Sequence, residues 1–391
     1  MRRVPATALL CLLIALRPGA SYPQEVDLSP ASWPAGELAH YTELNQSFAA
    51  KPPATGSGGM VTGTTGALAV RAGLEALRQG GSATDAALVT ALTEVTLAAG
   101  SWVSFAGIFN MVHYDAAKRK VRYVDGGFNT VLGETDPLSI PTTEPSGRTT
   151  LVPGLMAAVE AAHESFGKLP FEAIFTPAIY FAENGCPLDP GLSSQIQARS
   201  SVLQRLPATR EIFVKADGSL YRTGDIFRQP QLAETLRQVA AQGADYMYVG
   251  PWASKLVDAL QAEGGRMELE DLARYRALVK KAKKSRFHGD LWFGPGKPSA
   301  GGQLLAKSLK ALRRADLDEH YTESAETLHA LMSATRSVYK YVPALSHSDA
   351  VVAVDAEGNV AAVLHSINTA SWGDTGIFVD GARRPSRVEH L

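Results

Sequence analysis

Hydrophobic and polar positions follow a helical spacing over two stretches in the first quarter of the chain. Residues 66–79 carry apolar side chains about four apart, which predicts a helix that ends at the two glycines 80 and 81. Ser82 follows, with Asp85 three residues further on, and this spacing predicts a capping box at the start of a second helix over 83–98. The many small side chains of that second helix suit close packing.

Elsewhere the pattern changes to short apolar strands separated by polar turns. Residues 108–114 and 121–124 form one predicted strand pair, and residues 350–355 and 360–364 form another around a tight turn. Further helices are predicted between the two pairs, at 155–166, 171–184, 231–242, 252–263 and 303–313. The sequence therefore predicts a mixed α/β protein.

Composition narrows the class of protein. Of the 391 residues, 45% are hydrophobic and 20% are charged, which is typical of a soluble globular protein. The formal net charge is -1, so no overall field favours nucleic acid or anionic lipid as a partner. The basic run at 279–288 is interpreted as a solvated surface loop.

The N-terminus predicts export. In residues 1–21, two arginines precede an apolar core that is too short to span a bilayer, and small residues follow, as in a signal peptide. A periplasmic or secreted protein is therefore expected, and no later segment is apolar enough to cross a membrane. Residues 22–59, rich in Pro, Ser and Gly, predict an extended segment. After signal removal Cys186 is the single cysteine, and we interpret it as a packing residue because no base lies near it in sequence.

Six segments carry a resemblance to a known family when they are taken in order along the chain. They are Gly59-Met60-Val61 with 80–87, Val152-Pro153-Gly154 with 162–170, 177–185, 224–245, 264–275, and 298–302. Together they resemble the gamma-glutamyltransferase family of self-cleaving N-terminal-nucleophile hydrolases. The resemblance implies an α/β fold, a four-layer alpha-beta-beta-alpha sandwich that is incomplete at its C-terminal side. It also implies a large-subunit-like region at 60–347 and a truncated small-subunit-like region at 348–391.

The same resemblance implies a chemistry for the last predicted hairpin. Members cut themselves before a Thr whose hydroxyl then attacks gamma-glutamyl amides, with its own alpha-amine as the base. A hydroxyl needs such an adjacent base, and an alpha-amine with a pKa near 7.7 to 8.0 can serve. The Asp355 and Gly358-Asn359 turn sets the register and places Ser348 at the nucleophile position. The expected cleavage site is then the bond between His347 and Ser348, which Ser348 attacks by an N-to-O acyl shift.

Two further residues match positions of the family's site. Ser366 matches a hydroxyl that hydrogen-bonds the nucleophile, and Asn368 matches a residue that binds the substrate's alpha-carboxylate. Since they are two apart on a predicted strand, both are expected to face the same way. His365, between Leu364 and Ser366, is expected to face the opposite way, which argues against a Ser-His hydrolase. The resemblance implies small gamma-glutamyl compounds as substrates and no metal or organic cofactor.

The sequence departs from the family at points that bear on activity. Gly127 stands where the family has an Arg that clamps the substrate carboxylate, and Ser101-Trp102-Val103-Ser104-Phe105 replaces a glycine-rich turn. We expect Gly127 to face the site formed by Ser348, Ser366 and Asn368. The family's second chain continues beyond the length present here, so association with a separately encoded second half or a homo-oligomer is an open expectation. Two alternatives to a gamma-glutamyltransferase stay open: another amide hydrolase of the superfamily, such as an acylase, or an inactive remnant.

Overall fold

The structure, a computed structural model, describes residues 26–47, 58–299, 301–313, 315, 317, 319–340 and 348–383. The predicted signal peptide at 1–21 and the predicted cleavage residue His347 lie outside the described residues. Among the helices that the structure describes, none is long and apolar enough to span a bilayer.

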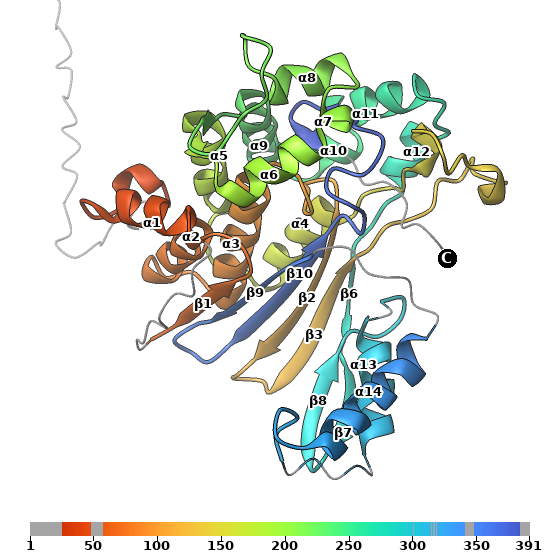
Figure 1. The fold of residues 1–391 in the computed structure, drawn as a ribbon. Coiled ribbons are helices and arrows are strands. Elements are labelled where there is room, and N and C mark those ends of the chain that lie inside the picture. The colour runs from red at the N-terminus through yellow and green to blue at the C-terminus, as the bar shows by residue number, and fades with distance from the viewer. Residues whose placement is uncertain are drawn as a thin grey trace, which may run out of the picture.

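The largest sheet among the described residues has six strands in the order β1-β9-β10-β2-β3-β6 (Figure 1), and all neighbouring pairs are antiparallel. Its strands are β1 (Met60–Gly63), β2 (Ile108–Asp115), β3 (Lys120–Gly126), β6 (Leu278–Lys281), β9 (Ser348–Val354) and β10 (Val360–Ser366). Both predicted strand pairs are present, and they lie side by side because β10 pairs with β2. The two hairpins therefore form the centre of one sheet although more than two hundred residues separate them in sequence.

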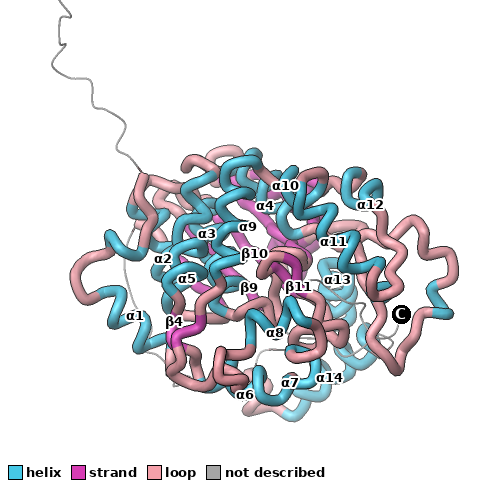
Figure 2. The backbone as a smooth tube through the Cα atoms, turned by 90° about the horizontal axis from the view of Figure 1, so that it is seen from above, coloured by secondary structure: helices cyan, strands magenta, loops and turns pink. Residues whose placement is uncertain are grey.

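Helices cover one face of this sheet in two layers, as the view from above shows (Figure 2). The helices that contact the strands are α2 (Ala67–Arg78), α3 (Ala83–Leu97) and α4 (Leu155–Phe166). Outside them pack α5 (Thr176–Asn184) and α9 (Pro230–Gln242), with α11 (Pro251–Gln261) beyond. The remaining helices on this side are α6 (Pro190–Ala198), α7 (Ser200–Leu203), α8 (Pro207–Phe213), α10 (Asp245–Tyr248) and α12 (Leu269–Ala273).

Helix α3 is the centre of the core. Its side chains from Ala83 to Thr96 are all buried, which explains the small residues of its sequence: the helix is enclosed by neighbours on every side. The predicted capping box is present, since the Ser82 side chain accepts from the backbone N–H of Asp85, whose carboxylate accepts from the backbone N–H of Ser82.

A second, smaller unit continues from the edge of the main sheet. Strand β7 (Lys283–Phe287) follows β6 after the single residue Ala282 and pairs with β8 (Asp290–Gly294). Helix α13 (Gly301–Leu312) packs on β7, and α14 (Ala325–Tyr339) packs on α13. The prediction of a surface loop at 279–288 is thus wrong in backbone structure, because the basic run forms β6 and β7; its lysines are exposed, as expected.

These elements confirm the predicted α/β class, because helices pack on a large sheet and a small unit of two strands and two helices follows β6. The second β layer that the resemblance implies is incomplete among the described residues: β7 and β8 form a separate two-stranded sheet that follows β6 along the chain. In the described part of the chain, two pairs of two-residue strands lie outside the main sheet: β4 (Cys186–Pro187) pairs with β5 (Ile226–Phe227), and β11 (Phe378–Val379) pairs with β12 (Ala382–Arg383). Isolated bridges join Asn129 to Val152 and Val214 to Leu220.

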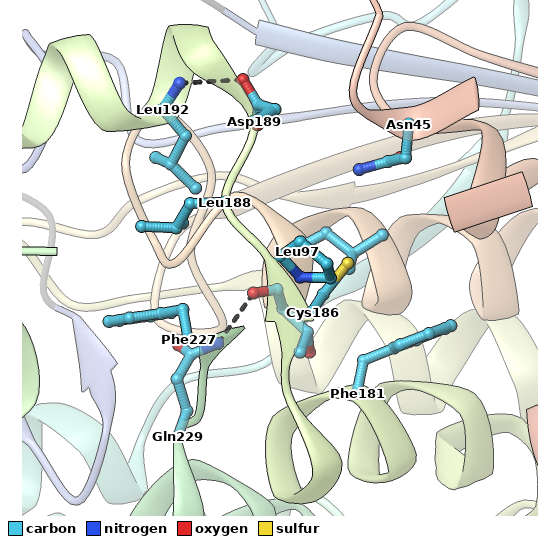
Figure 3. Close-up of a pocket in the computed structure, with 11 residues that line it drawn as sticks. Asn45, Leu97, Phe181, Cys186, Leu188, Asp189, Leu192, Phe227 and Gln229 are labelled. Carbon is cyan, nitrogen blue, oxygen red and sulfur yellow. Dashed lines mark hydrogen bonds between the residues drawn. The ribbon is translucent and has the colours of Figure 1, made fainter. Parts of the chain in front are cut away.

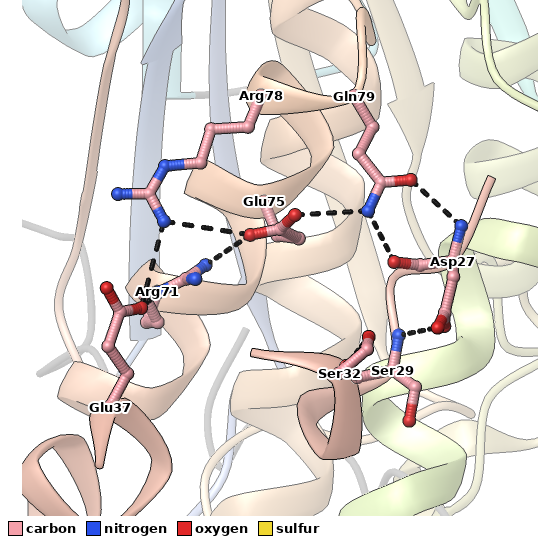
Figure 4. Close-up of polar contacts among 8 residues, drawn as sticks. All are labelled: Asp27, Ser29, Ser32, Glu37, Arg71, Glu75, Arg78 and Gln79. Carbon is pink, nitrogen blue, oxygen red and sulfur yellow. Dashed lines mark hydrogen bonds and ion pairs between the residues drawn. The ribbon is translucent and has the colours of Figure 1, made fainter. Parts of the chain in front are cut away.

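The N-terminal segment differs from the extended chain predicted for 22–59. It forms helix α1 (Glu37–Asn45), whose Glu37 pairs with the buried Arg71 of α2 (Figure 4). Arg71 also pairs with Glu75 and lies 4.5 Å above the ring of Trp33. A buried guanidinium requires such partners, so this segment is fixed by contacts that residue composition does not reveal.

Candidate functional site

Ser348 and Ser366, the two predicted catalytic residues, are direct cross-strand partners. Ser348 begins β9 and Ser366 ends β10, and their Cα atoms face each other in the antiparallel register. Directly opposed residues project to the same face of a sheet, so both hydroxyls lie on the face away from α3. Ser366 is buried and Ser348 half-buried. The structure thus brings the pair together, and the roles assigned to them stay predictions.

Asn368 lies next to this pair, although the reason given from strand alternation is wrong. Strand β10 ends at Ser366, and Asn368 has a left-handed backbone with φ of 53°. Its backbone N–H donates to the Ser366 Oγ at 3.0 Å. Asn tolerates this conformation better than most residues, so the turn holds Ser366 in place and leaves the half-buried Asn368 side chain at the rim.

Gly127 lies at the same end of the sheet. Ser366 pairs with Ile108 of β2, and the next residue of β2, Phe109, pairs with Gly126 at the end of β3. With strands about 4.8 Å apart, Gly127 is about 14 Å from Ser348, three strands away. The hydroxyl of Tyr275 donates to the Gly127 carbonyl at 2.6 Å, so the backbone here is fixed by a buried side chain.

Arg122 does not replace the arginine absent at position 127. Its register partner on β2 is His113, five residues along that strand from Ile108. At about 3.4 Å per residue this puts it about 17 Å away along the sheet. Its guanidinium lies over the ring of Phe166, 5.8 Å from the centroid. Arg122 therefore contacts the last residue of α4, far from the strand end that carries Ser366.

The bulky segment 101–105 is joined to the end of β10. The carbonyl of Trp102 accepts from the N–H of Ile367 at 3.1 Å, and the indole N–H of Trp102 donates to Asp349 Oδ1 at 2.9 Å. Trp102 thus contacts the residue that follows Ser348 and the residue that follows Ser366. The segment 101–105, which was predicted to alter the site, therefore contacts both β9 and the end of β10.

The opposite side of the same strand ends holds a buried polar cluster that sequence reasoning did not identify. Asp349 and His365 are cross-strand partners, adjacent to Ser348 and Ser366 but facing α3. His365 Nε2 is hydrogen-bonded to Glu94 Oε2 of α3 at 3.0 Å. This confirms that His365 faces away from Ser366 and excludes it as a direct base for that hydroxyl. The sequence signal was weak: one Glu in an otherwise small and apolar helix.

Burial dominates the electrostatics of this cluster. It raises the pKa of Glu94 to about 8, against hydrogen bonds from the backbone of Thr65 and Thr64 that lower it. It lowers the pKa of His365 to about 4, and it raises the pKa of Asp349, with the nearby Glu94 adding to the rise. Near neutral pH the imidazole is therefore uncharged, and Glu94 retains its proton.

Cys186 lies in a different place and has a different character. It lines a small cavity of about 20 Å³ with Phe181, Leu97 and Asn45, room for about one water molecule (Figure 3). Burial, helped by Asp189, raises the pKa of its thiol to about 12. A thiol that stays protonated is a poor nucleophile, in agreement with its interpretation as a packing residue.

Comparisons with known proteins agree on one family. Residues 69–356 match the family model of gamma-glutamyltranspeptidase. The glutathione hydrolase proenzyme of Bacillus subtilis strain 168 is 30% identical over 301 residues, which cover 73% of this chain and 50% of that protein. The acylase ACY 1 proenzyme of Pseudomonas sp. strain V22 is 29% identical over 304 residues, covering 74% of this chain and 54% of that protein. The chain spans about half the length of these curated relatives.

Solved structures give the same result for the fold. The gamma-glutamyltranspeptidase of Helicobacter pylori superposes with a TM-score of 0.67 at 26% identity, covering 74% of this chain and 84% of that chain. The cephalosporin acylase of Bacillus halodurans superposes with a TM-score of 0.72 at 21% identity, covering 88% of this chain and 72% of that chain. At that identity the second likeness concerns the fold alone.

Proposed function

Because the chain belongs to the gamma-glutamyltranspeptidase family, we propose that it cleaves gamma-glutamyl amides of the glutathione type after freeing Ser348 as an N-terminal nucleophile. The observation that supports this most is the pairing of Ser348 with Ser366 at the end of the central hairpin. Two independent observations select this pair. Counting back from the turn at Asp355 assigns Ser348 in the sequence, and the backbone hydrogen bonds of the strands place Ser348 opposite Ser366.

Self-processing would proceed in two balanced steps. The Ser348 hydroxyl attacks the His347 carbonyl carbon, the peptide C–N bond breaks, and the former amide nitrogen takes the hydroxyl proton. The ester that results is then hydrolysed by water, which leaves a carboxylate on His347 and a free alpha-amine on Ser348. A freed hydroxyl and amine on one residue supply both nucleophile and base.

Substrate cleavage uses the same attack of the Ser348 hydroxyl, now on the amide of a substrate. The alpha-amine accepts the Oγ proton as Oγ attacks the gamma carbonyl, and it then gives a proton to the leaving amine. The gamma-glutamyl ester on Ser348 is released to water or to an amino acid. In this proposal Ser366 orients the nucleophile and the Asn368 amide binds the substrate's alpha-carboxylate. Export to the periplasm or the medium remains part of the proposal.

A specific observation favours acylase activity as the second candidate. Gly127 offers no charge to a carboxylate, Arg122 lies at the other end of its strand, and Trp102 adds apolar surface beside the two strand ends. A substrate with a plain acyl group needs no carboxylate clamp. Comparing turnover of gamma-glutamyl anilide with that of simple acyl anilides separates the two candidates.

The test of the nucleophile combines mass and rate. The mature wild-type protein is expected to give two fragments that meet between His347 and Ser348, whereas Ser348→Ala stays one chain. Anilide turnover in Ser348→Ala should fall by a factor of at least about 10³, as for other lost nucleophiles. Ser348→Thr, which keeps the hydroxyl, should still be cut, and Ser346→Ala is the matched control that should behave as wild type. An uncut wild-type chain whose turnover survives Ser348→Ala contradicts the proposal.

A further inference from the structure

The cluster of Glu94, Asp349 and His365 has the arrangement of a set of metal ligands. One oxygen of each carboxylate is fixed by donors from outside the cluster. Glu94 Oε1 accepts from the backbone N–H of Thr65 at 3.1 Å, and Asp349 Oδ1 accepts from the Thr65 hydroxyl at 2.7 Å and from the Trp102 indole at 2.9 Å. Such outer hydrogen bonds hold ligating carboxylates in proteins that bind metals.

Two of the remaining polar atoms of the three residues have no hydrogen bond within the described part of the chain. Asp349 Oδ2 and His365 Nδ1 are buried, and neither has a hydrogen-bond partner among the residues that the structure describes. One potential ligand atom from each residue lies within 4.8 Å of the others, and all three side chains are buried. A buried polar atom that finds no partner costs about 1–3 kcal/mol, and an ion held between Glu94 Oε2 and His365 Nε2 would supply the partner that Asp349 Oδ2 lacks.

The charge of the cluster leads to the same conclusion. An ion that replaces the proton of Glu94 would be held by two buried carboxylates and a neutral imidazole. Among the described residues, Glu94 bonds to the neutral His365, and no Lys or Arg bonds to Glu94 or Asp349. Thr65 and Trp102, which enter from the segments around the strand ends, add neutral donors only. Buried charges of one sign require a cation, or a proton, to remain in place.

We propose that Glu94, Asp349 and His365 bind one divalent transition-metal ion, such as Zn²⁺ or Mn²⁺, beneath the ends of β9 and β10. One imidazole nitrogen with two carboxylates suits these ions, whereas Ca²⁺ and Mg²⁺ prefer oxygen alone. Glu94 Oε2 and His365 Nε2 lie 3.0 Å apart, and ligands about 2.1 Å from a tetrahedral ion lie about 3.4 Å apart, so a small outward shift of the two side chains admits the ion. The ion links α3 to both strands.

The proposal does not depend on the proposed function, because it rests on the face of the strands opposite to Ser348 and Ser366. The expected role is structural: the ion fixes the two strand ends that carry the serines.

Metal content of the purified full chain is the direct test. After dialysis against a chelator and reloading with Zn²⁺ or Mn²⁺, we expect about one ion per chain by elemental mass spectrometry and a raised melting temperature. Glu94→Gln and, as a second variant, Asp349→Asn should each lose the ion and the thermal shift. Glu160→Gln is the matched control, since Glu160 is a partly buried carboxylate on α4 that accepts from the backbone of Ala244.

Two outcomes would overturn the proposal. The first is wild-type protein that retains neither ion after reloading and shows no thermal shift with either, which means that a proton alone satisfies the cluster. The second is binding that Glu94→Gln or Asp349→Asn leaves as tight as in Glu160→Gln, which places the ion elsewhere. Neither readout uses catalytic activity, so failure here is distinguishable from failure of the Ser348 proposal.

Discussion

At the scale of single residues, neighbouring positions on one strand lie in different environments because their side chains project to opposite faces of the sheet. Ser366 and His365 project to opposite faces of β10, and the same holds for Ser348 and Asp349 on β9. Alternation along a strand follows from sequence, so the orientation of His365 could be predicted. Its partner Glu94 could not, because 271 residues separate them and only the folded sheet brings α3 beneath the strand ends.

The first prediction concerns Glu94 in protein kept free of metal by a chelator. Its folded pKa of about 8 lies above the value near 4.3 expected when unfolded, so its contribution to stability is full below pH 4 and lost as pH rises toward 8. His365 acts oppositely: its pKa is lowered to about 4, so its contribution is lost as pH falls below about 6.5. Above pH 6.5 the Glu94 effect should therefore dominate this cluster.

The measurement is urea unfolding between pH 6.5 and 8. The wild-type free energy of unfolding should fall by up to about 1.4 kcal/mol per pH unit from this group, and Glu94→Gln should flatten that slope. Glu211→Gln, at an exposed carboxylate of α8, should leave the slope unchanged. Equal slopes in wild type and Glu94→Gln would mean that Glu94 is ionised throughout this range.

At the scale of secondary-structure elements, the sequence predicted helices and caps that depend on neighbouring residues, and it missed elements that depend on tertiary contacts. The helix predicted at 155–166 has those bounds in the structure, and the capping box of α3 is present. The strands β7 and β8 were missed because their basic residues lack the alternation of a half-buried strand. Helix α1 was missed because Arg71 and Trp33 fix it through tertiary contacts. Asn368 was misjudged since alternation ends with the strand at Ser366.

The second prediction concerns the cap of α3. Asp85 is fully buried, and its Oδ2 accepts from the backbone of Ser82, Lys168 and Leu169, so it joins the helix start to a distant loop. Asp85→Ala leaves several buried N–H groups unpaired and should cost about 3–5 kcal/mol of unfolding free energy. Ser82→Ala removes one capping bond and should cost about 1 kcal/mol.

Denaturant unfolding of both variants checks this ordering. Ser324→Ala is the matched control, because Ser324 caps α14 through a bond to the N–H of Thr327. It should resemble Ser82→Ala. If Asp85→Ala loses no more than these two, then the bonds from 168 and 169 add nothing to the cap.

At the scale of the whole molecule, the central sheet has two unlike faces. The face toward α3 is covered by two layers of helices (Figures 1 and 2). Along β10, Val363 on that face is 3% exposed, whereas Leu364 on the other face is 45% exposed. The family resemblance predicted a second β layer, and among the described residues the β7–β8 hairpin is a separate sheet next to β6 in the chain. Sequence patterns alone did not indicate how much of the second face stays open.

The last prediction uses this contrast between adjacent residues. Leu364→Lys places a charge on an exposed surface, so the melting temperature should stay within a few degrees of wild type. Because the substitution removes apolar area from an open face, the protein should also associate less with itself. Val363→Lys buries an unpaired charge against α3 and should cost at least about 3–5 kcal/mol, enough to unfold a marginal domain. Light scattering after size exclusion, with thermal melts of both variants, provides the measurement. If Leu364→Lys destabilises the protein as much as Val363→Lys does, then the second face is covered in solution, by another copy of the chain or by a separate partner. A stable Leu364→Lys beside an unfolded Val363→Lys establishes that the sheet folds on one covered face and that the other face is open at Leu364.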